Sequence, residues 1–323
     1  MAEYKGIKGF KVQYLSADPS NPIVGQTWYN STSKDLKYTG VTTASAWASG
    51  GNLGTARRYL AGAGTQTAGL AFGGLTPPTN SSSTEEYNGS TWSPSNPINT
   101  ARYALGGFGT QTAALAFGGT PPITGVTEEY DGNSWTNSNP LNTARSAGAG
   151  AGTQTAGLFF GGVDPTTQVG VTEEYDGSSW ANSNNLNTAR GYLGGCGTQT
   201  SGLAFNGPAP VATGVTEEYN GISWASVNSM NTNRFLLVGA GIQTAALGFA
   251  GFVDGVGVSA ATEQYDGTSW TSTTSMATAR EQLAGAGTQA SALAFGGDSG
   301  SITAATEEWT GAGVALTKTI TVS

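Results

Sequence analysis

Pairs of adjacent glutamates recur along this chain and are the first residues whose chemistry has to be considered. Five phrases carry the pair or a Glu-Gln equivalent, and they read TEEYNGSTW, TEEYDGNSW, TEEYDGSSW, TEEYNGISW and TEQYDGTSW. Paired carboxylates hydrolyse glycosidic bonds, one as acid and the other as base or nucleophile. Adjacent residues of a β-strand point to opposite faces, so Glu173 and Glu174 cannot flank one bond. A catalytic pair would therefore need carboxylates from different copies of the phrase.

A structural role for these charges fits the repetition better. The glutamate two residues before the aromatic residue and one arginine occur in all six copies, whereas the position directly before the aromatic is Gln264 in the fifth copy. We predict that each arginine pairs with such a glutamate, within one copy or between neighbours, because an unpaired and partly buried charge is costly. The predicted structural set is Arg57, Arg102, Arg145, Arg190, Arg234, Arg280, Glu85, Glu128, Glu173, Glu217, Glu263 and Glu307.

The chain contains no histidine, and this excludes several kinds of catalysis. The Ser-His-Asp and Cys-His nucleophile systems, histidine-ligated metals and the usual general base near neutral pH all need that residue. Cys196 is the single cysteine, so there is neither an intrachain disulfide framework nor a cysteine metal cluster. We expect no catalytic residue, no metal and no cofactor, with a glycan-processing enzyme as the weakest alternative.

Charge and hydropathy exclude two classes of partner. The 323 residues carry a net charge of -8 with only 13 lysines and arginines and no basic run, so we expect no nucleic-acid partner. No stretch approaches the ~18 apolar residues of a membrane span, and the N-terminus lacks the apolar core of a secretory signal. We therefore expect no membrane insertion.

The chain repeats with a period of 43 to 46 residues, read from the tryptophans at positions 47, 92, 135, 180, 224 and 270. An arginine follows each tryptophan, and a Gly-Gly position follows each arginine, at constant distances. Only the interval from the Gly-Gly position to the next aromatic residue varies in length. Insertions are thus confined to one loop per unit, as expected for packed repeats with one free edge.

Each unit has the pattern of four short strands. Residues 145–184 read RSAGAGAGTQT, AGLFFGG, VGVTEEYDG and SSWANSN, with an Asp-Gly hairpin turn between the last two segments. Four strands in about 45 residues are typical of a β-propeller blade. The 50 glycines fit this architecture, because innermost strands crowd around a narrow channel where large side chains do not fit.

These features together resemble the kelch repeat: an apolar strand ending in Gly-Gly, a downstream Tyr-Asp, a nearby tryptophan and then an arginine. The resemblance covers roughly residues 47–309, with departures at Asn206, Ala250 and Trp309. It implies an all-β, kelch-like β-propeller of six blades, each with four antiparallel strands. The copper oxidases of this family need histidine and a cysteine-linked tyrosine, so that activity is excluded.

The ends of the chain leave two arrangements open. We expect residues 1–46 to form an N-terminal segment and hairpin, and residues 47–323 to form the propeller. The tail GVALTKTITVS aligns with a fourth strand, with Val314 where a tryptophan is expected, and would complete the sixth blade. Alternatively, the hairpin and the tail together would build a seventh blade.

The length-varying loops are the expected functional positions, because they differ where all other segments repeat. They read LTPPTNSSS, TPPITGV, VDPTTQVGV, PAPVATGV, FVDGVGVSAA and DSGSITAA and are expected on one face. The alternative is tolerated length variation without a function. The predicted contact residues are Pro77, Pro78, Pro121, Pro122, Asp164, Pro165, Pro208, Pro210, Phe252, Asp254 and Asp298.

The N-terminal phrase PIVGQTWYNSTSKDLKYTG is similar to a short segment of bacteriophage tail and fibre-associated structural proteins. The resemblance covers about 20 residues and implies a virion component, non-enzymatic and used for structure or host recognition. Its implied partners are other virion proteins or a host surface receptor or glycan, with several copies in an assembly. The alternative is a bacterial kelch-type module that binds a protein or carbohydrate in the cytoplasm or at the cell surface.

Overall fold

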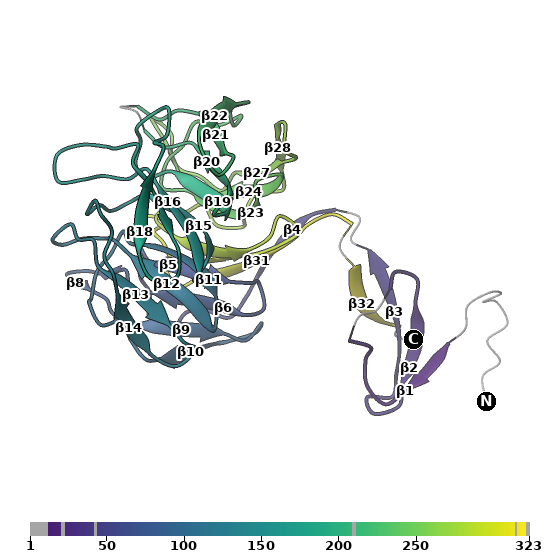
Figure 1. Ribbon diagram of the computed structural model, residues 1–323. Helices are drawn as coiled ribbons and strands as arrows, with labels where there is room; N and C mark the ends of the chain where they lie inside the picture. The colour runs from purple at the N-terminus through teal and green to yellow at the C-terminus, as the bar shows by residue number, and fades with distance from the viewer. Residues whose placement is uncertain (1–11, 21–22, 42–43, 209–210, 314, 321–323) are drawn as a thin grey trace, which may run out of the picture. The chain divides into compact units, whose positions relative to one another are not determined.

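The computed structural model describes residues 12–20, 23–41, 44–208, 211–313 and 315–320, and within these ranges its regular elements are all β-strands (Figure 1). The chain divides into two compact units. Unit 1 comprises Met1–Ser45 and Thr310–Ser323, and unit 2 comprises Ala46–Trp309. The all-β prediction is confirmed.

Unit 2 consists of six four-stranded sheets, the blades. In five of them the strands follow one another along the chain from the innermost to the outermost, and in the sixth the outermost strand is the N-terminal β4. The innermost strands are β5 (Ala61–Gly64), β11 (Gly106–Thr110), β15 (Ala149–Thr153), β19 (Gly194–Thr198), β23 (Val238–Ile242) and β29 (Ala284–Gly287). The second strands are β6 (Gly69–Phe72), β12 (Ala113–Phe117), β16 (Ala156–Phe160), β20 (Ser201–Phe205), β24 (Ala245–Phe249) and β30 (Ser291–Phe295). The third strands are β9 (Thr84–Tyr87), β13 (Thr127–Tyr130), β17 (Thr172–Tyr175), β21 (Thr216–Tyr219), β27 (Thr262–Tyr265) and β31 (Thr306–Thr310). The outermost strands are β10 (Trp92–Ser95), β14 (Trp135–Ser138), β18 (Trp180–Ser183), β22 (Trp224–Val227), β28 (Trp270–Thr273) and β4 (Ala46–Ser49).

The innermost strands form a closed ring. Each packs against the innermost strand of the next blade, from β5 through β11, β15, β19 and β23 to β29, and β29 packs against β5 again. Unit 2 is therefore a six-bladed β-propeller. The alternative prediction of seven blades is wrong, because among the described residues no further strand enters this ring.

The sixth blade is completed by β4 and not by the C-terminal tail, which corrects the sequence-based expectation. Trp47 on β4 packs against Phe249 and Trp309, with ring centroids 5.1 and 5.4 Å apart, and its indole nitrogen donates to Thr262 at 3.1 Å. The tail lacks a tryptophan to make these contacts, and Val314 lies outside the described residues. The tail strand β32 (Ala315–Ile320) instead pairs antiparallel with β3 (Asp35–Val41).

Unit 1 is a separate four-stranded sheet in the order β1 (Gln13–Leu15), β2 (Thr27–Asn30), β3 and β32 (Figure 1). Strand β1 runs parallel to β2, and β2 and β3 form an antiparallel hairpin. Trp28 is fully buried and donates to Asp18 at 3.0 Å, while Lys37 contacts the same carboxylate at 2.7 Å. The hydrogen bond from Lys37, followed by those from Asn30 and Trp28, lowers the pKa of Asp18 to about 2.

Glycine is required where innermost strands approach each other. A Cβ atom at Gly239 would lie 2.5 Å from the carbonyl oxygen of Gly195, and one at Gly62 would lie 2.9 Å from that of Gly285. Backbone atoms cannot move away as a flexible side chain can. The glycine excess is thus explained by the crowding around the channel.

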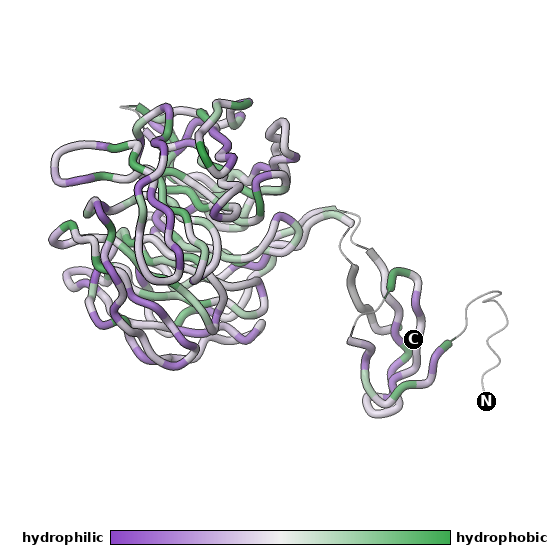
Figure 2. Tube along the Cα trace, viewed as in Figure 1, coloured by the Kyte–Doolittle hydropathy of each residue, from purple (hydrophilic) through white to green (hydrophobic). Residues whose placement is uncertain are grey.

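Tryptophan side chains fill the space between adjacent blades and bond each blade to the preceding one. Trp180 packs on Phe117 of the preceding blade with ring centroids 5.1 Å apart, and its indole nitrogen donates to Thr127 of that blade at 3.0 Å. The same Phe contact and Thr bond recur for Trp47, Trp92, Trp135, Trp224 and Trp270. Figure 2 shows hydrophobic segments running through unit 2. The tryptophan rings add to the apolar area that is buried between the blades.

Candidate binding site on the loop face

The length-varying loops share one face of unit 2 with the connectors that enter each innermost strand. Isolated antiparallel bridges join the two kinds of segment: Arg58 with Leu75, Tyr103 with Thr120, Ser146 with Val163, Phe235 with Phe252, and Glu281 with Asp298. Two of the loops fold into small hairpins, β7 (Leu75–Thr76) with β8 (Thr79–Asn80), and β25 (Phe252–Val253) with β26 (Gly257–Val258). We call the surface formed by these loops and connectors the loop face.

Most of the predicted contact residues do lie on the surface of this face. The exposed ones are Pro77, Pro78, Pro121, Pro122, Pro165 and Asp254, and the half-buried ones are Asp164, Pro208, Phe252 and Asp298; Pro210 lies outside the described residues. Three of them are engaged within the protein. Phe252 packs on Phe235, Asp298 accepts from Arg58 at 2.7 Å, and Asp254 accepts from the backbone of Ala212 at 3.2 Å.

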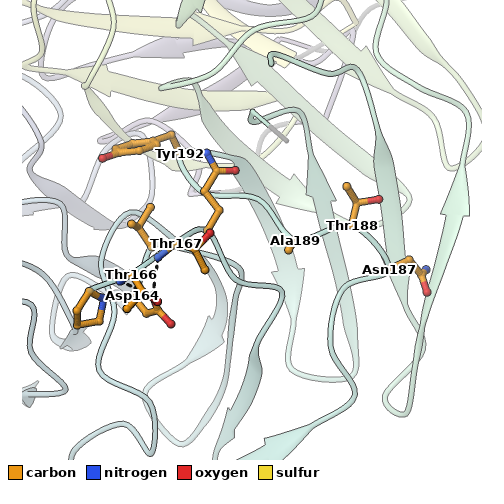
Figure 3. A pocket seen from close by; sticks show the side chains of 10 residues that line it. Asp164, Thr166, Thr167, Asn187, Thr188, Ala189 and Tyr192 are labelled. Carbon is orange, nitrogen blue, oxygen red and sulfur yellow. Dashed lines mark hydrogen bonds between the residues drawn. The ribbon is translucent and has the colours of Figure 1, made fainter. Parts of the chain in front are cut away.

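One groove on the loop face has the size of a ligand site. It has a volume of about 740 Å³ and lies between residues 163–168 of the third blade and residues 187–192, which lead into the fourth (Figure 3). Its polar lining comprises Asp164, Thr166, Thr167, Gln168, Asn187 and Thr188, together with the phenol of Tyr192. Of the predicted contact residues, the structure thus brings Asp164 and Pro165 to this groove.

The carboxylate of Asp164 is held in a fixed orientation. Its Oδ1 accepts hydrogen bonds from the backbone N–H groups of Thr166 and Thr167 at 2.7 and 2.8 Å, and from the Thr166 hydroxyl at 2.7 Å. The Thr166 hydroxyl bond, followed by the two backbone bonds, lowers the pKa of Asp164, so this group is ionised at neutral pH. Its Oδ2 has no hydrogen-bond partner among the described residues and is available to a ligand.

Tyr192 belongs to a closed ring of backbone hydrogen bonds around the end of the channel. Its N–H donates to the carbonyl of Ala147 at 2.7 Å, and each equivalent residue donates in the same way to the preceding blade. The six residues, which we call the mouth ring, are Tyr59, Ala104, Ala147, Tyr192, Leu236 and Gln282. All six have positive φ, between 50° and 57°. This conformation is unfavourable by about 1–2 kcal/mol for a residue other than glycine, and here the ring of bonds holds it.

A second, smaller hollow lies at the mouth ring. It has a volume of about 100 Å³ and is lined by the mouth ring and by the residues that follow it, five of them leucines. Sequence reasoning missed this region, although a signal existed. Two consecutive positions after the repeating arginine differ from blade to blade: Arg58-Tyr59, Tyr103-Ala104, Ser146-Ala147, Gly191-Tyr192, Phe235-Leu236 and Glu281-Gln282.

The repeating arginines and glutamates lie inside the blades, away from both hollows. All six arginines contact their glutamate within the same blade, as in Arg190–Glu217 at 2.6 Å and Arg57–Glu85 at 3.0 Å. These side chains are buried, and burial lowers the pKa of Arg57, Arg145, Arg190, Arg234 and Arg280 against the attraction of the glutamates. The glutamate Oε2 also accepts a backbone N–H from the connector after the preceding blade, as Glu173 does from Asn142 at 2.7 Å. Each pair thus ties a blade to the connector that enters it.

No protein-family model matches the chain, and no curated protein is similar to it. Within the described ranges, no group of histidine, cysteine, aspartate and glutamate side chains could hold a metal ion. The same ranges contain no helix that is long and apolar enough to cross a membrane.

Proposed function

We propose that this protein is a non-enzymatic binding component of a bacteriophage virion that recognises a host surface glycan through the groove on the loop face. The groove lined by Asp164, Gln168 and Tyr192 carries this proposal. Carboxylates, amides and hydroxyls pair with sugar hydroxyl groups, and a tyrosine ring packs against the apolar face of a sugar. A groove of about 740 Å³ is also within the usual size range of ligand sites.

The absence of a second carboxylate in the groove supports binding rather than hydrolysis. Glycosidases use two carboxyl groups about 5–9.5 Å apart, one on each side of the bond. Among the described residues that line the groove, Asp164 supplies the only carboxylate. The repeating glutamates are occupied by buried arginines, as Glu173 is by Arg145.

The virion assignment rests on the N-terminal resemblance. The phrase that carries it forms the β2–β3 hairpin of unit 1, so the resemblance coincides with a separately folded unit. We assign unit 1 to contact with another virion protein, and unit 2, as a kelch-like propeller, to the glycan. The cellular alternative, a bacterial kelch-type binding module, shares the same groove.

The glycan part is tested by screening the whole chain on an array of bacterial surface oligosaccharides, followed by calorimetry with a ligand found there. Asp164→Asn and Tyr192→Leu should each weaken binding by about tenfold, since each removes about one good contact. Leucine is chosen because Leu236 has the same positive φ in the fifth blade. Asp131→Asn is the matched control and should bind normally, because this exposed carboxylate also accepts two backbone hydrogen bonds but lies outside the groove.

The glycan assignment would be overturned if the wild type bound no glycan, or if both groove variants bound the ligand as tightly as the wild type. Release of new reducing ends from the ligand would favour the enzyme alternative. The virion part is tested separately by mass spectrometry of purified particles. The chain found only in bacterial cells would favour the cellular module.

A further inference from the structure

A cluster of polar and aromatic side chains lies where the sixth blade meets the first at the mouth ring. Arg58 and Asp298 form an ion pair across this junction, with Nη1 and Oδ2 2.7 Å apart. The Gln282 amide donates to Glu281 Oε1 at 2.9 Å. Arg58 and Glu281 each follow directly on a repeating arginine, and the other four blades have Tyr, Ser, Gly and Phe there.

The charges in this cluster are not balanced. The guanidinium of Arg58 is bound to Asp298, whereas Glu281 is held by a neutral amide. Arg58, Asp298 and Glu281 together carry a net charge of minus one, and all three side chains are half-buried. Burial, followed by the nearby Asp298 carboxylate, raises the pKa of Glu281. A further cation would relieve the repulsion between the two carboxylates.

Two tyrosine rings pack on each other next to the mouth ring. Tyr59 packs against Tyr103 with ring centroids 5.7 Å apart, and the guanidinium carbon of Arg58 lies 5.9 Å from the Tyr59 ring centroid. Burial, followed by the proximity of Tyr192 and Glu281, raises the pKa of Tyr59 to about 12. Tyr59 and Tyr103 thus pack on each other, and Gln282, which lines the hollow together with Tyr59, donates to Glu281.

The hollow beneath them is small and apolar at its base. Its volume of about 100 Å³ would hold roughly three water molecules at ~30 Å³ each, so a sugar ring does not fit. Leu60, Leu193 and Leu283 line it below Tyr59, Tyr192 and Gln282. A small head group with methyl or methylene groups would fit the apolar surface.

We propose that the mouth of the channel is a binding site for an organic ammonium group, primary or methylated. Tyrosine faces attract such a cation through their quadrupoles, and a carboxylate pairs with its charge. The apolar floor accommodates the carbon atoms attached to nitrogen. This site goes beyond the proposed function, because it does not require a glycan.

Calorimetry of the whole chain with choline and with ethanolamine tests the proposal, with the methylated and the primary amine as separate arms. The matched control ligand is 3,3-dimethyl-1-butanol, which has the shape of choline without its charge. We expect at least one amine to bind at about millimolar concentration, about tenfold more tightly than the alcohol. Equal binding of choline and the alcohol would show an uncharged apolar hollow and overturn the proposal, as would no binding of either amine at about 50 mM.

Glu281→Gln should weaken amine binding by about tenfold and leave the alcohol unchanged, because it removes only the charge. Tyr59→Leu should weaken it by about threefold to tenfold, and Leu236 shows that the backbone accepts leucine. Ser146→Ala, at the position of Glu281 in the third blade, should leave the affinity for the amine unchanged.

If Glu281→Gln fails to fold, Glu281→Ser is used instead, because serine is the residue at this position in the third blade. Unchanged amine affinity in both Glu281→Gln and Tyr59→Leu would mean adventitious binding and would overturn the proposal. Glycan binding through the groove should survive Glu281→Gln, so the two proposals fail independently.

Discussion

Gln264 and Trp309 stand at one junction between adjacent blades. At each of the five remaining junctions these positions hold a glutamate and a tyrosine that hydrogen-bond to each other. At the other five junctions the tyrosine hydroxyl of one blade donates to the second glutamate of the preceding blade, in the pairs Tyr87–Glu308, Tyr130–Glu86, Tyr175–Glu129, Tyr219–Glu174 and Tyr265–Glu218. Trp309 instead donates to the carbonyl of Gln289 at 2.8 Å. A carboxylate at position 264 would lack its phenol donor, which explains the neutral amide there.

This relationship predicts a measurable coupling between positions 264 and 309. Gln264→Glu alone should lower the free energy of unfolding by about 1 kcal/mol, because it places a half-buried carboxylate without its donor. Trp309→Tyr alone should also destabilise, because the smaller ring leaves a cavity. The double variant should be about 1 kcal/mol more stable than the sum of the two effects, as measured by urea unfolding. Simple additivity would show that the two positions are independent.

The buried ion pairs predict a large loss on truncation. Arg145→Ala should lower the free energy of unfolding by about 3–5 kcal/mol, because it leaves the buried carboxylate of Glu173 without its partner. Arg58→Ala is the control, since its pair with Asp298 is partly exposed, and should cost about 1 kcal/mol or less. Unchanged stability of Arg145→Ala together with lost ligand binding would contradict a structural role.

The glutamine of the repeated G-x-Q motif joins each blade to the preceding one. Gln154 donates from its amide to the carbonyls of Ala114 and Tyr130 at 3.1 and 2.7 Å. The same pair of bonds is made by Gln66, Gln111, Gln199, Gln243 and Gln289. Gln154→Ala should lower the free energy of unfolding by about 1–2 kcal/mol, because two carbonyls lose their donor. Thr155→Ala, at an exposed position of the same turn, should change it by less than about 0.5 kcal/mol. Equal urea midpoints for the two variants would contradict a stabilising role of the two hydrogen bonds from the glutamine amide.

The tyrosines between blades predict a loss of stability at alkaline pH. Burial and the hydrogen bond to a glutamate raise the pKa of Tyr87, Tyr130 and Tyr219 to about 12, above the usual value of ~10. The protonated phenol is the form favoured by folding, so this contribution is complete below about pH 10 and is lost as the pH rises through 12. Urea midpoints measured between pH 9 and 12 should fall over this window, and less steeply in Tyr130→Phe. A flat profile would argue against the phenol-to-carboxylate bonds.

Several structural features followed from the residues alone. The alternation of aromatic and small residues in TEEYDGSSW predicts a hairpin, and Tyr175 and Trp180 are indeed directly opposite each other in it. The constant spacing of tryptophans predicts equivalent blades, because each indole must reach the same phenylalanine and threonine of its neighbour. The one variable interval predicts loops on a shared edge, since a length change elsewhere would disrupt the ladder of strands.

Other features depended on which segments meet in space. By position the tail was expected to be the fourth strand of the sixth blade, and the contacts of Trp47 with Phe249 and Thr262 explain why β4 completes that blade instead. The correspondence between the departures at Gln264 and Trp309 could not be read from the sequence either, because the two residues belong to different copies of the repeat.

The sequence by itself determined a repeated four-stranded unit, buried charges in equal copies and one free edge, because strand pairing and hydrophobic alternation are local. The tertiary structure decided where the ring closes and which side chains gather at its mouth. Tyr59, Tyr192 and Gln282 are more than 40 residues apart along the chain, and only a closed ring of backbone hydrogen bonds turns them toward one hollow.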